Sequence, residues 1–333
     1  MLDLLGYGAF FLVTALTFGI LCLGLNLQWG QTGLFNVGVA GFVAIGAYTS
    51  ALITTPETAG RIGGLGLPIV VGWGSAMLVS GFAAALIGAV TLRLRSDYLA
   101  IATFGVAVCI QLLALNLQSV TGGPFGIGFI PRPFASLQGD ALGFNLANLA
   151  LIVALTLAVF LALERLVRSP WGRVLRAIRE DEAAATELGK NPAAYRLQAF
   201  VIGSAILGLG GAVQAHFIGF IAPENYLPAL TFQVWAMLIV GGSGNNRGAL
   251  LGAIMVWGFW TLSGALVASL FPIEQQARGA ALQIVLIGIM LSAILLIRPQ
   301  GILGEVRTVS RFIAGKQAGA DGGAARINSG RKL

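Results

Sequence analysis

Residues 5–27 read LGYGAFFLVTALTFGILCLGLNL and contain no charged side chain. A helix that crosses the hydrocarbon of a bilayer needs about 20 mostly apolar residues, and this stretch meets that length. Further apolar runs follow at 33–53, 68–92, 98–118, 144–167, 197–222, 229–242, 248–271 and 280–297. Because every backbone polar group must be paired inside a bilayer, we expect these runs to be helices. The sequence predicts an all-α polytopic membrane protein with about nine transmembrane helices, within a range of about eight to ten.

The composition agrees with a protein that lies almost wholly in a membrane. Of 333 residues, 57% are hydrophobic and 10% are charged, and the mean hydropathy is +0.87. Soluble domains carry about 25% charged residues, so a soluble globular enzyme is excluded, and so is a disordered chain. We expect one transmembrane domain over 1–304 and a disordered cytoplasmic tail over 305–333, which is polar, basic and rich in Gly and Ala.

The basic residues predict how the spans are oriented. Lys and Arg accumulate in cytoplasmic loops, and we take the charged loop 168–196 as cytoplasmic. With alternate crossings, Arg61, Arg132 and Arg278 fall outside and the rest of the 20 Lys and Arg residues fall inside. The run 229–242 is short enough to be a re-entrant or broken helix, but the charge count favours a crossing. The N-terminus is then periplasmic and the C-terminus cytoplasmic, and the net charge of +7 reflects topology, not a nucleic-acid partner.

Enzymatic and ATP-binding motifs are missing from the sequence. Gly-Lys occurs at 189–190 and 315–316, but neither pair has the first Gly or the following Ser or Thr of a phosphate-binding loop. One His and two isolated Cys offer no metal-ligand cluster, so no cofactor is predicted. The spans hold almost no ionisable groups, whereas proton-coupled carriers keep such groups in the bilayer. Active transport would need energy from another polypeptide. An autonomous homo-oligomeric facilitator fits these absences equally well.

The loop 168–196 contains the most informative segment, SPWGRVLRAIREDEAAATELGKN. Ser169 suits a helix N-cap, Pro170 the first helical position and Gly189 a C-terminal cap. Apolar residues recur between them at helical spacing, at Trp171, Val174 or Leu175, Ile178, Ala185 and Leu188. This pattern predicts an amphipathic helix of about 18 residues, or two short ones, outside the bilayer.

Charges divide this segment into a basic first half and an acidic second half. An interfacial helix held to anionic lipid explains the arginines, but it does not explain Glu180, Asp181, Glu182 and Glu187. An apolar stripe flanked by mixed charge is typical of a helix that docks in a groove of a protein partner. We therefore expect this segment to bind another protein and to transmit its movement to the span at 197–222.

Several segments together resemble one known family. Residues 172–226 read GRVLRAIREDEAAATELGKNPAAYRLQAFVIGSAILGLGGAVQAHFIGFIAPENY, and this stretch is similar to the permease subunits of bacterial branched-chain amino-acid ABC transporters, the LivM type. Other matching segments are GLNLQWGQTGLFNVGVAGFVAIGAYTSAL from Gly24, RLRSDYLAIATFG from Arg93, TGGPFGI from Thr121, VGGSGNNRGALLGA from Val240 and RPQGILG from Arg298. The resemblance covers nearly the whole chain. Permeases for urea and short amides are close relatives, so these compounds are the alternative substrates.

The resemblance implies a subunit of an importer in the bacterial inner membrane. Its partners would be a second permease subunit, two cytoplasmic ATP-binding subunits and a periplasmic substrate-binding protein. Glu182, Ala183 and Ala184 resemble the EAA-type loop of ABC importers, although Gly189 follows Glu182 by seven positions, where the commoner pattern has six. The implied ATPase-coupling residues are Arg173, Arg176, Ile178, Arg179, Glu180, Asp181, Glu182, Ala183, Ala184, Leu188 and Gly189.

Polar side chains within the spans are the candidates for the translocation path. A free amino acid is zwitterionic and crosses lipid only at high cost, so polar groups must face its route. The candidates are Asn36, Gln111, Asn116, Gln214, His216 and Gln233. Each could instead hold two helices together, and we expect only two or three to contact substrate. Charges that could dock the binding protein on the exterior side are Glu57, Arg61, Arg132, Asp140 and Glu224.

Overall fold

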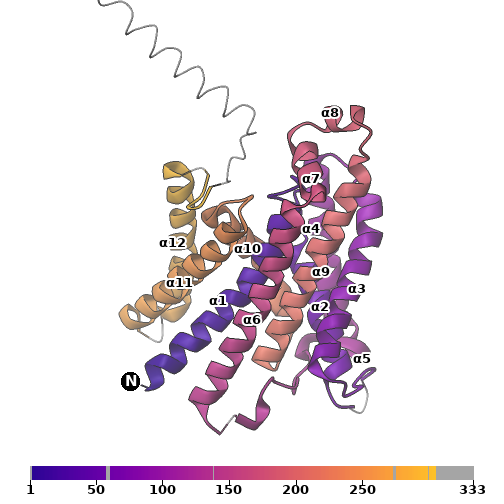
Figure 1. Ribbon diagram of the computed structural model, residues 1–333. Coiled ribbons are helices and arrows are strands. Elements are labelled where there is room, and N and C mark those ends of the chain that lie inside the picture. The colour runs from indigo at the N-terminus through magenta and orange to yellow at the C-terminus, as the bar shows by residue number, and fades with distance from the viewer. Residues whose placement is uncertain (1, 58–60, 138, 273–274, 299, 305–333) are drawn as a thin grey trace, which may run out of the picture.

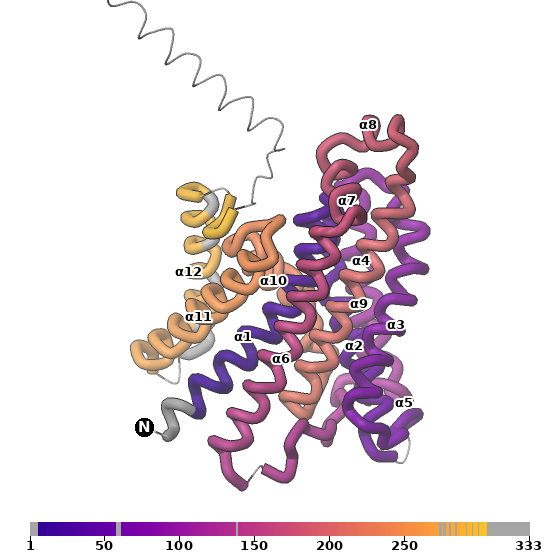
Figure 2. The backbone as a smooth tube through the Cα atoms, viewed as in Figure 1, coloured from indigo at the N-terminus to yellow at the C-terminus, as the bar shows by residue number. Residues whose placement is uncertain are grey.

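The computed structural model describes residues 2–57, 61–137, 139–272, 275–298 and 300–304 (Figures 1 and 2). Its α-helices are α1 (Leu2–Gln28), α2 (Val39–Thr54), α3 (Ile69–Thr91), α4 (Ser96–Asn116), α5 (Gln118–Thr121), α6 (Ala141–Arg168), α7 (Pro170–Glu180), α8 (Glu182–Glu187), α9 (Pro192–Ile218), α10 (Pro228–Gly241), α11 (Asn246–Leu270) and α12 (Gln276–Ile297). Short 3-10 helices are η1 (Gly123–Phe125), η2 (Ala135–Leu137) and η3 (Pro223–Tyr226). The predicted tail 305–333 lies outside the described residues.

Each apolar run predicted from the sequence contains a helix, so the all-α prediction is confirmed. Within the described residues, six helices are long and apolar enough to cross a membrane, namely α1, α3, α4, α6, α9 and α11. The shorter apolar helices are α2, α10 and the Ala281–Ile294 part of α12. Nine spans remains an approximate number, because α2 and α10, with 16 and 14 residues, are shorter than the about 20 residues that a crossing helix needs.

The helices α1 and α9 occupy the centre of the bundle. In each of these two helices, 67% of the residues in the most apolar 18-residue stretch are buried. The corresponding share is 22% in α6 and 28% in α3, α4 and α11. Helix α9 packs against α1, α2 and α3, while α10 and α11 pack beside α1 and α12 packs against α11 and α10 (Figure 1). The outer helices therefore present apolar side chains outward, as lipid-facing helices do.

The run 33–53 does not begin as a helix, which corrects the predicted start of that span. Residues between Gln28 and Val39 form an irregular segment, and α2 starts only at Val39. Gly33 has a φ of +71°, and a Cβ on Gly38 would lie 2.6 Å from the Thr103 carbonyl oxygen of α4. Irregular backbone at membrane depth is tolerated where protein surrounds it. Here the buried side chains of Gln31 and Asn36 belong to that segment.

Helix α10 is the short run whose crossing the sequence left open. Its 14 residues span about 21 Å, less than the hydrocarbon thickness of about 30 Å. The chain nevertheless passes from one end of the bundle to the other between α9 and α11. Ile218 accepts a hydrogen bond from Arg132 at one end, and Gly244 contacts Asn26 near the C-terminal end of α1 at the other. The segment with η3 precedes α10 and adds to its length, so the path of the chain agrees with the crossing that the charge count favours.

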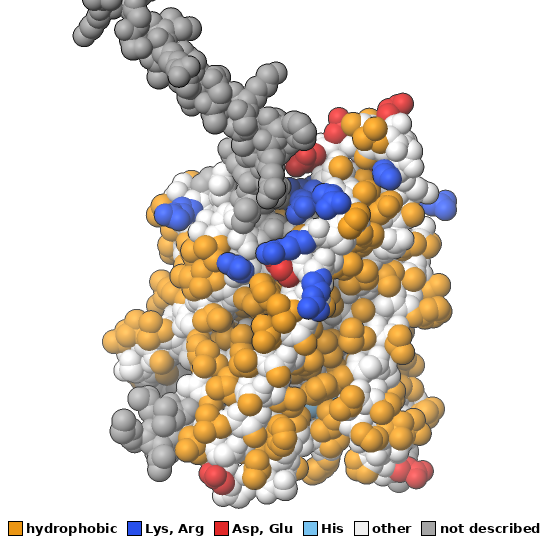
Figure 3. Space-filling view, in the orientation of Figure 1, with side chains coloured by type: hydrophobic (Ala, Val, Ile, Leu, Met, Phe, Trp, Pro, Cys, Tyr) orange, Lys and Arg blue, Asp and Glu red, His pale blue; other side chains and the backbone are white. Residues whose placement is uncertain are grey.

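Charges are concentrated at the ends of the molecule. On the face shown in Figure 3, Lys and Arg gather at the end that carries α7 and α8, and a broad apolar zone follows below them. The N-terminal end of α1 lies at the opposite end from α8, whereas α12 ends near the α8 end (Figure 1). The two ends of the apolar zone are therefore chemically different.

Candidate functional site

Two short helices form the predicted partner-binding segment. Helix α7 begins at Pro170, with Ser169 as N-cap residue, and α8 follows after Asp181, whose carboxylate accepts from the Ala184 amide at 2.9 Å. Gly189 has a φ of +74° just beyond α8, a conformation that glycine adopts readily. The structure therefore contains the two short helices that the sequence offered as one of two forms. The Ser169 hydroxyl caps nothing in α7 and donates instead to the Leu166 carbonyl.

The apolar stripe of α7 packs on this chain itself. Leu175 and Ile178 are fully buried, and Ala185 of α8 is nearly so. Leu188 is 79% exposed, which makes it the large apolar side chain of the segment that a partner can reach. Of the other coupling candidates, Arg176 and Arg179 are half-buried. The exposed ones are Arg173, Glu180, Asp181, Glu182, Ala183, Ala184 and Gly189.

Three side-chain contacts fasten α7 and α8 to the membrane helices. Arg179 donates from its guanidinium to the Gly30 carbonyl, in the irregular segment that follows α1. Trp171 donates from its indole to the Gln198 amide oxygen of α9 at 2.7 Å. Glu182 forms an ion pair with Arg196 of α9 at 2.9 Å. These contacts connect α7 and α8 to the segment after α1 and to the beginning of α9.

A polar cluster at the same end was not predicted from the sequence. Asn26 of α1 donates to the Asn246 side chain of α11 at 2.9 Å, and Asn246 donates to the Glu164 carboxylate of α6 at 3.1 Å. The Gly244 amide donates to Asn26 Oδ1 at 2.8 Å. Glu164 also pairs with Arg168 at the end of α6, directly before α7. The cluster thus connects α6, α1 and the glycine-rich turn between α10 and α11.

Asn36 holds segments of the protein together. Its side chain donates to Gln28 Oε1 at 2.8 Å and accepts from the Gly38 amide, and its carbonyl accepts from the Trp235 indole at 2.9 Å. Gln28 in turn donates to the Phe200 carbonyl and to the Ser204 hydroxyl of α9, each at 3.0 Å. Since Asn36 is fully buried and has all these partners, the geometry gives it a structural role.

His216 has a similar structural position. Its Nδ1 lies 2.7 Å from the Pro131 carbonyl oxygen, which can only accept, so Nδ1 carries the proton. Its Nε2 then accepts from the Ser50 hydroxyl at 2.8 Å. The neutral ring joins α9 to α2 and to the loop before α6.

Replacement of His216 with Leu is expected to destabilise the fold. Ser50 and the Pro131 carbonyl would lose their partner inside the bundle, at a cost of about 1–3 kcal/mol. Thermal unfolding in detergent should show a lower midpoint than for wild type, while Gln111→Leu, a change on the half-buried face of α4, should leave the midpoint unchanged. An unaltered midpoint for His216→Leu would contradict a structural role.

Two other candidates, Gln214 and Gln233, come together on one cavity. This cavity, of about 860 Å³, lies between α1, α9, α10, α11 and α12. Its walls carry mostly aromatic and aliphatic side chains, among them Phe18, Phe217 and Trp257. Glu224 and Asn225 of η3 also line it, together with Thr14 and Thr17 of α1. An apolar cavity with a few convergent polar groups is the usual form of a small-molecule site.

Gln111 and Asn116 do not line this cavity. Both belong to α4, where Gln111 is half-buried, and the exposed Asn116 donates to the Leu112 carbonyl of its own helix at 2.8 Å. The sequence could not separate these two from Gln214 and Gln233, because all four are amides in apolar runs. The packed helices separate the two pairs, because Gln214 and Gln233 line the cavity and Gln111 and Asn116 do not.

A helical bundle with an apolar outer surface and a partly open cavity edged by amides has the architecture of a polytopic membrane protein. The chain belongs to the family described as "branched-chain amino acid transport system / permease component", which matches residues 8–295. It is therefore a transport component, as its relatives are.

Several curated proteins are similar to this chain in sequence. The high-affinity branched-chain amino acid transport system permease protein LivM of Salmonella typhimurium is 34% identical over 90% of this chain and 71% of its own length. LivM of Escherichia coli is 37% identical over 71% of this chain, but the match covers 59% of the relative, so this chain spans little more than half of it. The LivH permease protein of Salmonella typhimurium is 26% identical over 87% of this chain and 92% of its own length. No solved structure matches the chain.

Proposed function

We propose that this chain is one of two permease subunits of an ABC importer for branched-chain or related amino acids in a bacterial inner membrane. Two cytoplasmic ATP-binding subunits drive it, and a periplasmic binding protein delivers the substrate. The α8 end is cytoplasmic in this proposal, because the basic side chains gather there. The N-terminus is then periplasmic and residues 300–304 are cytoplasmic.

The single observation that carries the transport proposal is the cavity beside Gln214 and Gln233. A branched-chain amino acid has an apolar side chain and a zwitterionic head. The aromatic walls of the cavity can pack against the apolar side chain, and the amides of Gln214 and Gln233 can form hydrogen bonds with the zwitterionic head. Glu224 lies at the η3 side of the cavity, where its carboxylate attracts an ammonium group. The other wall of the path belongs to a second permease, and the similarity of this chain to both LivM and LivH supports such a pair.

The coupling proposal rests on the way α7 and α8 are mounted. The buried stripe of Leu175 and Ile178 packs α7 against the bundle, while Glu187 and Leu188 at the end of α8 are exposed. An ATP-binding subunit that binds α8 would transmit its movement to α9 through the Glu182–Arg196 ion pair. It would also move the segment after α1 through Arg179 of the adjoining α7. Asn36 lies in that same segment and binds the Trp235 indole of α10, the helix that carries Gln233. This gives a continuous route from α8 to the cavity.

Replacement of Gln233 with Leu tests the path. Loss of a hydrogen bond to a charged group costs about 1.5–3 kcal/mol, which corresponds to about tenfold to hundredfold slower uptake at low substrate concentration. Uptake of labelled leucine by cells or proteoliposomes that contain the whole transporter measures this. Gln214→Leu should act in the same direction, and Gln111→Leu is the matched control, because Gln111 is an amide in an apolar helix that does not line this cavity. Normal uptake by both cavity variants would remove this cavity from the path.

The purified chain alone distinguishes the importer from a facilitator. In liposomes without ATP-binding subunits, an importer subunit should give no substrate flux above that of protein-free vesicles. Rapid flux that needs neither ATP nor a second polypeptide would contradict the proposal and support the homo-oligomeric facilitator instead.

A further inference from the structure

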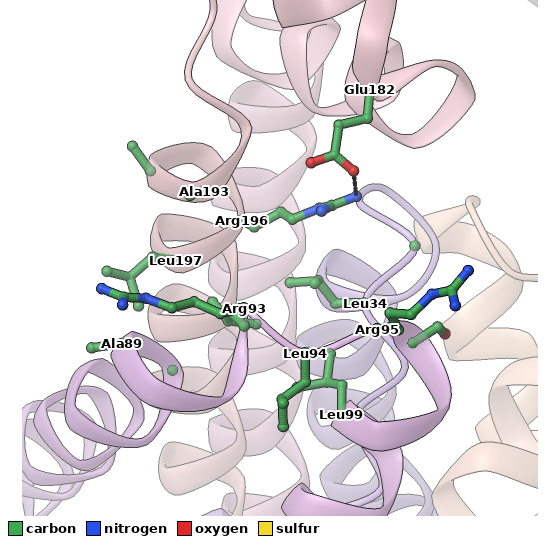
Figure 4. Close-up of a pocket in the computed structure, with 15 residues that line it drawn as sticks. Leu34, Ala89, Arg93, Leu94, Arg95, Leu99, Glu182, Ala193, Arg196 and Leu197 are labelled. Atoms are coloured by element: carbon green, nitrogen blue, oxygen red, sulfur yellow. Dashed lines mark ion pairs between the residues drawn. The ribbon is translucent and has the colours of Figure 1, made fainter.

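A second cavity lies at the α8 end, apart from the proposed path. It has a volume of about 730 Å³ and is enclosed by the turn between α3 and α4, the segment after α1, α8 and the first turns of α9 (Figure 4). No residue of this cavity is among the six path candidates. Its lining has two chemically distinct parts, one basic and one apolar.

The basic part consists of three arginines. Figure 4 shows Arg93 and Arg95 on opposite sides of the cavity, with Arg196 between them. Glu182 is the one carboxylate on the lining, and it is engaged with Arg196 at 2.9 Å. Arg196 Nε is nevertheless buried without a hydrogen-bond partner. The lining therefore has an excess of positive charge and a buried donor that lacks an acceptor, both of which point to an anionic ligand.

The apolar part consists of leucine side chains, of which Leu34 and Leu99 are buried and Leu94 is exposed. They are Leu34, Leu92, Leu94, Leu99 and Leu197. The adjacent faces of α3 and α4 are strongly apolar and open, since Val90 is 73% and Ile101 69% exposed. In a membrane protein such faces contact acyl chains. Tyr98 is exposed near the start of α4, and exposed tyrosines are common at the boundary between headgroups and hydrocarbon.

We propose that this cavity binds an anionic phospholipid, with the phosphate beside Arg196 and flanked by Arg93 and Arg95, and with the acyl chains along Leu94 and the exposed apolar faces of α3 and α4. A basic pocket between membrane helices suits a lipid headgroup. An acidic side chain of a soluble partner would use the basic part alone and leave the leucines uncovered. The phosphate satisfies the free Nε of Arg196 and competes with Glu182 for the same guanidinium. The position of α8 therefore depends on whether the lipid is bound.

Lipid retention by the purified full-length chain tests this proposal. The chain is equilibrated with mixed micelles of phosphatidylglycerol or phosphatidylcholine, and native mass spectrometry counts the lipids that remain bound. Wild type should retain phosphatidylglycerol selectively. The double variant R93Q/R95Q should retain about tenfold less of it, the change that corresponds to one lost hydrogen bond to a charged group. The matched control is R247Q/R298Q, which removes two exposed arginines elsewhere on the chain.

Two further arms separate the possible results. Leu94→Asn, a change at a partly exposed leucine, should also reduce phosphatidylglycerol retention, whereas a site for a bare anion would not respond to it. Inorganic phosphate should not displace the bound lipid; displacement would assign the site to a free anion and overturn the lipid proposal. If R93Q/R95Q and R247Q/R298Q lose the same amount of bound phosphatidylglycerol, retention depends on general surface charge and the proposal of a specific site is wrong. A normal gel-filtration profile of each variant ensures that retention is measured on folded protein. None of these readouts depends on the transported substrate.

Discussion

Replacement of Gly46 with Ala is expected to prevent the bundle from assembling. A Cβ at position 46 of α2 would lie 2.1 Å from the Gly208 carbonyl oxygen and 2.4 Å from its Cα in α9. Both atoms belong to backbone, so no side-chain rotation relieves the overlap, and the two helices must separate. Position 208 also faces Ser80 of α3, where an added Cβ would lie 2.1 Å from the hydroxyl oxygen. Separation of α2 from α9 therefore also disturbs α3, and we expect the free energy of unfolding to fall by about 3 kcal/mol or more.

The matched control for this prediction is Gly105 of α4. A Cβ there meets nothing within 4 Å, and Ala is the better helix former by about 1 kcal/mol in exposed helices of soluble proteins. Gly105→Ala should therefore be as stable as wild type or more so. Gel filtration of the detergent extract, followed by thermal unfolding, measures both variants. A monodisperse Gly46→Ala protein with the wild-type midpoint would show that α2 and α9 can move apart at little cost.

Much of the architecture could be predicted because membrane spans are recognised by length and the absence of charge. The runs that contain α1, α3, α4, α6, α9 and α11 meet both conditions directly. The irregular start before Val39 could not be predicted, because Gly33 and Gly38 adopt their conformation through contacts with other helices. Gly33 faces the Arg179 side chain of α7, and Gly38 faces the Thr103 carbonyl of α4. An apolar sequence contains no information about such neighbours.

The candidate site shows the same limit more strongly. Asn36, His216, Gln214 and Gln233 are all polar residues in apolar runs, yet the first two are fully occupied by partners within the chain and the last two face a cavity. Which neighbours surround a polar side chain is a property of the packed helices. Glu164 was missed because it stands at the edge of a run and resembles an ordinary terminal charge. The signal in the sequence for the polar cluster around Glu164 was the pair Asn245 and Asn246 in a glycine-rich turn.

Replacement of Glu182 with Lys is expected to abolish ATP-driven uptake without preventing membrane insertion. The side chain is about half exposed on α8 and its carboxylate lies 2.9 Å from Arg196 of α9. A lysine there would repel Arg196 and present the wrong charge to an ATP-binding subunit that docks on α8. Loss of one partner of an interfacial charge pair costs about 2–5 kcal/mol, so the association should weaken about thirtyfold or more. Co-purification of the ATP-binding subunits with the tagged permease, together with leucine uptake, measures both effects.

A charge swap separates the two roles of Glu182, because it restores one of them alone. In the double variant Glu182→Arg/Arg196→Glu, the ion pair between α8 and α9 can form again with reversed direction, while the charge that α8 presents to its partner stays reversed. If Glu182 acts through docking, the double variant should remain as defective in co-purification as Glu182→Lys. If it acts only by holding α8 against α9, the swap should restore both co-purification and uptake. Full activity in Glu182→Lys itself would contradict both roles, and it would mean that force enters the membrane helices through the remaining contacts of α7, at Arg179 and Trp171.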